Sequence, residues 1–410
     1  LRTAWSYKAQ FISMVLMVML GVGVFVGFNM EWTSIEHNMF AFFDQSNFAD
    51  YRLVNEKGYS QEDLEKIRSI EGVRAASRFL TVNADVKDSG GDSAALAVTT
   101  DFDVSSFVVI KGGAYDPNSA DGIWLSDRYA EQNGISVGDE LSFVYRNTEI
   151  TGKVAGLIKA AEQMICVRDK TQLMPDFATH GYAYISPVFY ESALGYGYYP
   201  QINVLSELDK QDFFDRVNSA LGQTTVILTK EDTPAYSQAE GEVSEGKAMG
   251  SILPALFLLI GLLTMVTTMH RITAKEKTQI GTLKALGFRD GRIIRHYTSF
   301  AFLVAVLGTA LGVGMGYAIA WFIMNPDGMM GTYLDLPQWN LVFPWFCAAA
   351  AAAIVLVLTL IGFLSVRRML AGTAADALRP YTPKKVRPMV IERTRLFHRL
   401  PFGTRWNMRD

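Results

Sequence analysis

The chain has 410 residues, of which 50% are hydrophobic and 19% charged, a balance that is unusually apolar for a soluble protein. Its formal net charge of −3 argues against nucleic-acid binding. Two cysteines cannot build a disulfide framework, and five scattered histidines without ligand-like spacing argue against a metal site. We therefore expect neither a cofactor nor a metal on this chain.

The first predicted element is a membrane span at residues 10–28. These residues carry no charge and match the ~20 residues needed to cross a bilayer core. A signal peptide is the alternative, but the apolar run is too long and no small-x-small cleavage site precedes Asn29. Apolar residues continue at helical spacing, so we predict that the span, within residues 1–29, runs directly into a stalk helix at 30–49.

Residues 50–230 are predicted to form a mixed α+β domain, large enough to bury its own core. Helices are predicted at residues 60–71, with Ser60 as N-cap, and at 126–132 and 209–221. Short β-rich runs between turn residues predict strands at 79–86, 94–99, 106–110, 140–145, 151–158, 182–185, 201–205 and 225–228. Polar, helix-compatible residues then predict a second stalk helix at 231–250.

Residues 251–366 contain three further apolar runs, which predict spans at 251–269, 297–323 and 341–366. The predicted fold is therefore an α-helical multi-pass membrane protein with four transmembrane helices. A large α+β domain is inserted between the first and second of them.

Basic residues predict the orientation of these spans. Lys and Arg are concentrated in residues 269–295 and in the tail at 367–410, whereas the turn at 324–340 has none. Because basic loops mark the cytoplasmic side of a membrane, we predict that the N-terminus and both basic segments are cytoplasmic. Residues 30–250 are then extracytoplasmic.

Two glycine patterns are better explained by packing than by nucleotide binding. Residues 241–248 nearly match a phosphate-binding loop, but Ala248 stands where a hydroxyl would ligate magnesium and no strand precedes the loop. Gly308, Gly312 and Gly316 are predicted to allow close helix packing within the membrane, and self-association through them remains open. No residue is assigned a catalytic role.

The basic segment between the second and third spans contains a predicted amphipathic helix at residues 274–288. Ile280, Leu283 and Leu286 share one face of it, with charged residues around them. Two interpretations compete: a helix lying on the lipid surface, or a helix docking into a groove of a partner protein. Residues 276–287 lack large aromatic anchors, and their glycines weaken the helix in isolation, so partner docking is favoured.

A recognisable motif covers the same segment. The pattern R-x-x-x-K-E-x-x-x-I-G-x-L-K-A-L-G extends from Arg271 to Gly287, and A-x-A-L-R-P follows at residues 375–380. Together with the order of span, outside domain and three spans, these motifs resemble the FtsX/MacB superfamily of ABC-transporter permeases. Further likeness to that family's MacB-type periplasmic core domain lies at residues 67–73, 122–130, 138–139 and 153–157.

The resemblance implies that the helix at 274–288 couples to a separate ABC ATPase subunit, which holds ATP and magnesium. The residues expected at this interface are Arg271, Lys275, Glu276, Gln279, Ile280, Leu283, Lys284 and Leu286. Gln279 departs from the family pattern, which often has Glu there, so no charged contact is carried over to it.

The resemblance also implies that two permease units pair in the membrane and that movement passes through the stalks to the outside domain. Both ends of the chain resemble the borders of a family unit. We therefore expect the chain to be the first of two tandem repeats, with the tail at 367–410 leading to the second.

We expect a non-catalytic permease subunit in a bacterial cell membrane that exports or extracts a lipid, lipoprotein, peptide or antibiotic. Its expected partners are the ATPase, a second permease unit, membrane lipids and an extracytoplasmic protein. One alternative is an FtsX-like regulator of extracytoplasmic cell-wall hydrolases. The other is a membrane-anchored enzyme whose active site lies in residues 30–250.

Overall fold

The computed structural model describes residues 8–169, 171–172 and 174–369. The chain divides into two compact units. The first comprises Leu1–Met265 and Phe302–Thr359 and contains the sheet domain. The second comprises Val266–Ala301 and Leu360–Asp410 and contains the predicted docking helix. The expected tail at 367–410 lies almost entirely outside the described residues.

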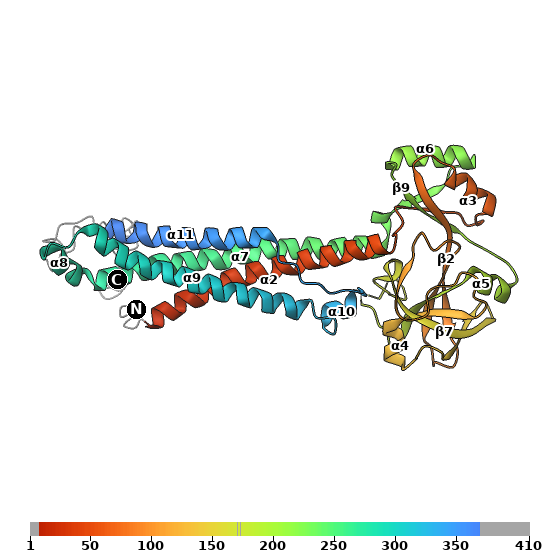
Figure 1. Ribbon diagram of the computed structural model, residues 1–410, viewed down its shortest axis with the longest axis horizontal. Helices are drawn as coiled ribbons and strands as arrows, with labels where there is room; N and C mark the ends of the chain where they lie inside the picture. Colours follow the sequence, from red (N-terminus) through yellow and green to blue (C-terminus); the bar gives the residue numbers. More distant parts are fainter. Residues whose placement is uncertain (1–7, 170, 173, 370–410) are drawn as a thin grey trace, which may run out of the picture. The chain divides into compact units, whose positions relative to one another are not determined.

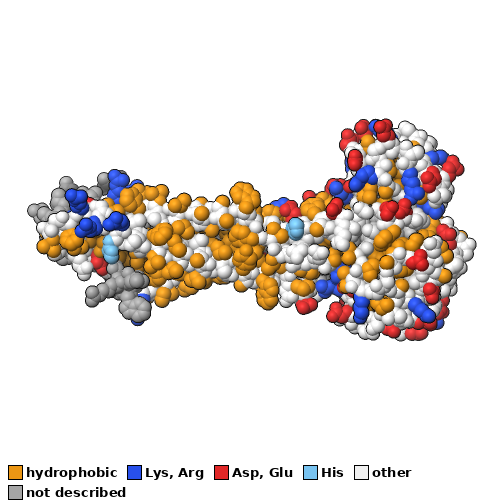
Figure 2. All heavy atoms as spheres, in the orientation of Figure 1, with side chains coloured by type: hydrophobic (Ala, Val, Ile, Leu, Met, Phe, Trp, Pro, Cys, Tyr) orange, Lys and Arg blue, Asp and Glu red, His pale blue; other side chains and the backbone are white. Residues whose placement is uncertain are grey.

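Four helices of the described chain are long and apolar enough to cross a membrane (Figure 1). They are α2 (Lys8–Gln45), α7 (Pro234–Lys275), α9 (Asp290–Ile323) and α11 (Trp345–Met369). On the face shown in Figure 2, hydrophobic side chains cover much of these helices, whereas acidic side chains gather on the sheet domain.

The predicted first span and first stalk are one helix. α2 has 38 residues, which at 1.5 Å per residue is roughly 57 Å, and so exceeds the ~30 Å hydrocarbon core of a bilayer. α7 likewise combines the second predicted stalk with the second span in 42 residues, and the near-miss phosphate motif at 241–248 is helical within it. Each helix is therefore long enough to cross the membrane and continue beyond it.

The glycine ladder of α9 faces α2 of the same chain. A Cβ added at Gly308 or Gly312 would lie 2.7 Å from the Cβ of Val18 or Val22, respectively, and the backbone of α2 is close behind. Such contacts are too short for any side chain. Glycine thus lets the two helices pack backbone against backbone, as small residues do in lipid.

The sheet domain is built on ten strands in the order β10-β1-β9-β2-β3-β8-β5-β7-β4, with β6 paired to both β2 and β7. The strands are β1 (Tyr51–Val54), β2 (Val73–Val86), β3 (Ser93–Thr99), β4 (Phe107–Gly112), β5 (Gly122–Ser126), β6 (Glu140–Tyr145), β7 (Thr148–Ala160), β8 (His180–Ile185), β9 (Gln201–Ser206) and β10 (Val226–Thr229). The β3–β8 and β5–β7 pairs are parallel and the other pairs antiparallel. Because β6 bridges β2 and β7, the strands β2, β3, β8, β5, β7 and β6 close into a ring.

The long strand β2 joins this ring to a second lobe. The ring encloses an apolar core to which Leu125, Phe143 and Ile185 belong. In the second lobe, α3 (Gln61–Arg68) and α6 (Lys210–Leu221) cover β1, β9 and β10 around a core of their own (Figure 1). The remaining short helices are α4 (Asp127–Asn133), α5 (Pro187–Leu194), α8 (Lys277–Ala285) and α10 (Met329–Tyr333), with 3-10 turns at Ala161–Gln163 and Lys230–Asp232.

Local sequence signals account for most of these elements. Ser60 caps α3 as predicted, and its side chain accepts a hydrogen bond from the Asp63 backbone N–H. All eight predicted strands are present, with ends that differ by up to six residues. β1, β5 and α5 have no counterpart among the elements predicted from the sequence.

Candidate functional site

The predicted docking helix is shorter than its sequence pattern suggests. α7 ends at Lys275, and α8 is a separate helix of nine residues that ends at Ala285. Gly287 adopts a left-handed conformation with φ 85°. Its N–H donates to the Lys284 carbonyl and the Phe288 N–H donates to the Leu283 carbonyl, both at 3.0 Å. This Schellman arrangement ends the helix before residue 288.

Three of the expected interface residues hold the segment together instead of facing outward. Ile280 is 3% exposed, so its side chain is buried. Glu276 accepts a hydrogen bond of 3.0 Å from the Tyr297 hydroxyl of α9. Lys284 pairs with Asp290 at 3.1 Å, and only 12% of the Lys284 side chain is exposed. These contacts fix α8 against the beginning of α9.

The outward surface consists of an apolar pair within a basic surround. Leu286 is 71% and Phe288 42% exposed, on either side of the Gly287 turn. Leu283 is half-buried. The same segment, residues 271–295, also exposes five basic side chains together with Gln279 and Asp290; the basic ones are Arg271, Lys275, Arg289, Arg292 and Arg295. Figure 2 shows Lys and Arg side chains gathered in the region where Figure 1 labels α8.

Phe288 is an exposed apolar residue that is not among the interface residues expected from the sequence. It follows the helix-ending glycine, at the position that often carries an apolar side chain after a Schellman turn. Helical periodicity stops at that glycine, so the pattern used to choose the face did not reach Phe288. Leu286 and Phe288 together form an exposed apolar pair on a turn whose backbone is fixed by two hydrogen bonds.

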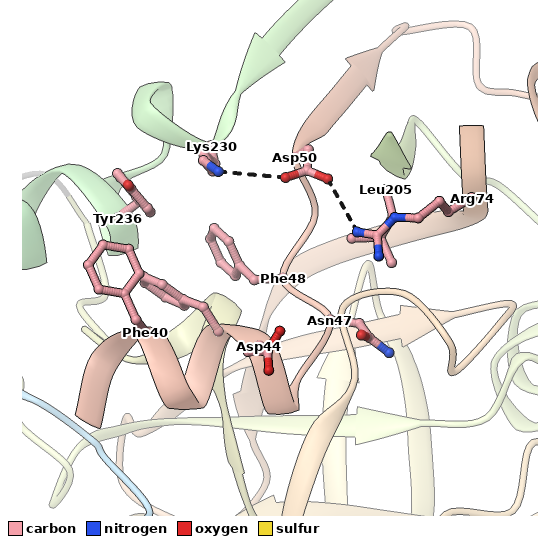
Figure 3. Close-up of a pocket in the computed structure, with 10 residues that line it drawn as sticks. Phe40, Asp44, Asn47, Phe48, Asp50, Arg74, Leu205, Lys230 and Tyr236 are labelled. Atoms are coloured by element: carbon pink, nitrogen blue, oxygen red, sulfur yellow. Dashed lines mark ion pairs between the residues drawn. The ribbon is translucent and has the colours of Figure 1, made fainter. Parts of the chain in front are cut away.

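A second candidate site is a pocket of about 220 Å³ where α2 meets the sheet domain (Figure 3). Phe43 stacks on Phe48 and Tyr236, with ring centroids 4.5 and 5.5 Å apart. Asp50 lies 3.6 Å from the Lys230 ammonium and 4.0 Å from the Arg74 guanidinium.

The pocket is smaller than the roughly 300–1,000 Å³ of most small-molecule sites, and its central carboxylate is matched by two cations. The pocket lies where the stalk helix meets the sheet domain.

Comparisons with known proteins bear on the region that carries the apolar pair. Residues 251–374 match the family model described as FtsX-like permease C-terminal. The macrolide export ATP-binding/permease protein MacB of Chromobacterium violaceum is 26% identical over 200 residues. Both matches are to FtsX/MacB-type permeases, the family that the sequence motifs resemble. With its four apolar helices, the chain is a multi-pass membrane protein.

The match with MacB covers 44% of this chain and 30% of that relative's length. Two solved structures are also similar. One is the extracellular domain of the noncanonical ABC-type transporter YknZ from Gram-positive bacteria, with a TM-score of 0.33 and 12% identity, covering 44% of this chain and 98% of that one. The other is the periplasmic region of MacB from Actinobacillus actinomycetemcomitans, with a TM-score of 0.32 and 10% identity, covering 50% and 97%.

Proposed function

We propose that this chain is the permease subunit of an ABC transporter and that a separate ATPase subunit drives it by docking on the Leu286–Phe288 pair. The pair lies inside the FtsX-like region, is exposed, and stands on a rigid turn. Its basic surround suits an acidic rim on the partner, since complementary charges guide docking. That exposed pair is the observation on which the proposal chiefly rests.

The orientation follows from the same basic residues. Because Lys and Arg mark cytoplasmic loops, α8 is proposed to lie in the cytoplasm and the sheet domain outside the cell membrane. Residues 324–340, which contain neither Lys nor Arg, would then lie on the outer side. ATP and magnesium would be bound by the ATPase.

Movement is proposed to reach the sheet domain through the two stalk helices, which are bonded to each other. The Asn29 side chain of α2 donates to the Gly250 carbonyl of α7 at 2.9 Å. Lys247 pairs with Glu36 at 2.9 Å and lies 4.7 Å from the ring centroid of Trp32. A shift of one stalk is therefore transmitted to the other. The proposed cargo is a lipid, lipoprotein, peptide or antibiotic, and pairing with a second permease unit belongs to the same proposal.

Replacing the apolar pair by acids tests the docking. The Leu286→Asp/Phe288→Asp variant should insert normally yet lose about tenfold or more of its bound ATPase, because central apolar contacts of an interface contribute ~2 kcal/mol or more each. The measurement is purification of the tagged chain from its host membranes. Vanadate-sensitive ATP hydrolysis and mass spectrometry of Walker-motif peptides then quantify the ATPase.

Ile110→Asp is the matched control, since Ile110 is an apolar side chain 45% exposed on β4. This control should retain the ATPase. A double variant that inserts in the membrane and still binds the ATPase at the level of the unaltered chain would refute docking at this pair. Ile280 is unsuitable for the test because its substitution would disturb internal packing.

A further inference from the structure

The connection between α9 and α11, residues 324–344, is anchored on the sheet domain, although its sequence suggests a free polar turn. Leu334 and Leu336 are 0% and 1% exposed and belong to an apolar cluster with residues of α2, α7 and the segment after β7. Asp335, between them, is also 0% exposed. Its backbone N–H donates to the Met164 carbonyl at 2.8 Å.

The Asp335 carboxylate lies in a buried cluster of charges. Its Oδ1 contacts the Lys159 ammonium and lies 3.4 Å from the Arg128 guanidinium, and its Oδ2 accepts a 2.6 Å hydrogen bond from the Tyr182 hydroxyl. Lys159 also pairs with Asp127 at 3.0 Å. Two acids thus balance two cations. Burial, reinforced by the charge of Asp335, raises the pKa of Tyr182 well above its ordinary value, so its hydroxyl stays protonated as a donor.

Such a cluster specifies position more than it adds stability. Removing charges from water costs nearly as much as their attraction returns, so buried ion pairs can often be replaced by apolar groups of similar size. An extended Leu-x-Leu segment can slide by two residues and still bury apolar side chains. A single carboxylate opposite Lys159 allows only one register.

The other end of the connection is held by α2. The Asn38 side chain donates to the Asn340 carbonyl at 2.8 Å and accepts from the Asn340 N–H at 3.0 Å. The Ser34 hydroxyl accepts from the Val342 N–H at 2.9 Å. Ser34 and Asn38 are themselves buried. The connection is therefore bonded at one end to the stalk and at the other to the sheet domain.

We propose that Asp335 is a positioning residue that fixes the α9–α11 connection to the sheet domain in one register. Movement of α9 and α11 then reaches the sheet domain by this second route, besides the stalk helices α2 and α7. The inference rests on the proposed function only for the cytoplasmic origin of the movement. The attachment itself involves no partner.

Hydrogen exchange of the purified full chain in detergent tests the attachment. Asp335→Asn removes one charge with little change of shape, and Lys159→Met/Asp335→Leu replaces the central pair by apolar side chains. Without the carboxylate the segment can occupy more than one register, so its amides lose their fixed hydrogen-bond partners even where the apolar replacement costs little stability. Both variants should therefore raise the exchange rate of amides in residues 327–342 by at least about tenfold, while β2 and β3 stay protected. If Asp335→Asn fails to fold, the exchange rates of the double variant decide the test.

Lys87→Met/Glu149→Leu is the matched control, because that ion pair of 2.8 Å joins two half-exposed side chains on the same domain. It should leave the connection unchanged. A folded Lys159→Met/Asp335→Leu variant with unaltered protection at 327–342 would overturn the proposal.

The ATPase-bound form separates this proposal from the previous one. Both Asp335 variants should keep their bound ATPase, whereas Leu286→Asp/Phe288→Asp loses it. ATP should change the exchange pattern of the sheet domain in the unaltered complex, and the Asp335 variants should lose at least half of that response. A full response in a variant whose connection is loosened would show that the second route carries no movement.

Discussion

His180 is a buried histidine at the beginning of β8, with its Nδ1 2.8 Å from the Ser93 hydroxyl. Burial, with the nearby Arg168 cation, lowers the pKa of its imidazole from the ordinary value of 6.5. The folded state therefore binds a proton less readily than the unfolded chain does. Its contribution to stability is present above pH 6.5 and is lost as the pH falls from there through the lowered folded-state pKa.

Removing this titration should flatten the acid side of the stability curve. Between pH 7.5 and pH 5, the melting temperature of the His180→Gln variant should fall by less than that of the unaltered chain. Thermal unfolding of both chains at the two pH values measures the difference. Parallel pH profiles would show that His180 does not titrate between the two states.

Single residues also show where sequence reasoning about the site stopped. Helical spacing placed Leu286 within the amphipathic helix, whereas α8 ends at Ala285 and Leu286 is its C-cap; the spacing also could not tell which side faces a neighbour. Two of the expected interface residues interact with α9 instead of facing outward. Glu276 accepts a hydrogen bond from Tyr297, and Lys284 forms an ion pair with Asp290. Asp335 read as a polar turn residue because its partner Lys159 lies 176 positions away.

At the scale of elements, the sequence predicted whatever had a strong local signal. Capped helices such as α3, and strands with alternating apolar residues, were found. β1 has only four residues and pairs with β9 and β10, which lie some 150 residues further along the chain. β1 is a strand because it is hydrogen-bonded to these two distant strands, a contact that its own four residues do not predict. α5 has a clear N-cap in Ser186 with proline in its first turn, a local signal that was available but overlooked.

The α2–α9 contact gives a prediction at this scale. Gly312→Ala places a methyl group 2.7 Å from the Cβ of Val22, so the helices must separate, at a cost of ~1–3 kcal/mol. Gly314→Ala is the control, since a Cβ there meets nothing within 4 Å. Unfolding of the two variants in mixed detergent micelles compares their stabilities. Equal stabilities would show that the helices do not depend on close approach at Gly312.

At the scale of the whole molecule, the number of spans was predictable because apolar length is a strong signal. The proposed side of the membrane for each part rests on charge alone, and a labelling experiment can test it. The two natural cysteines, Cys166 and Cys347, are buried. Burial, together with the Asp335 charge, raises the pKa of the Cys166 thiol, so it reacts slowly.

Labelling of introduced cysteines can therefore be measured over little labelling of the two natural ones. In spheroplasts, a membrane-impermeant maleimide should label the Asn118→Cys variant of the sheet domain strongly. It should label the Ala285→Cys variant of α8 only after the membrane is opened. Both positions are exposed within their own units. Labelling of Ala285→Cys in sealed spheroplasts would reverse the proposed orientation.

The buried charge cluster also imposes an order on biosynthesis. Arg128 and Lys159 leave the ribosome long before Asp335, so a sheet domain that folds during synthesis does so with this basic site incomplete. The cluster is completed only when α9 and α11 have been inserted and their connection reaches the folded domain. A chain whose last two helices fail to insert therefore keeps two cations without their main counter-ion. An incompletely assembled chain therefore differs from a finished one in carrying two cations that lack the Asp335 carboxylate.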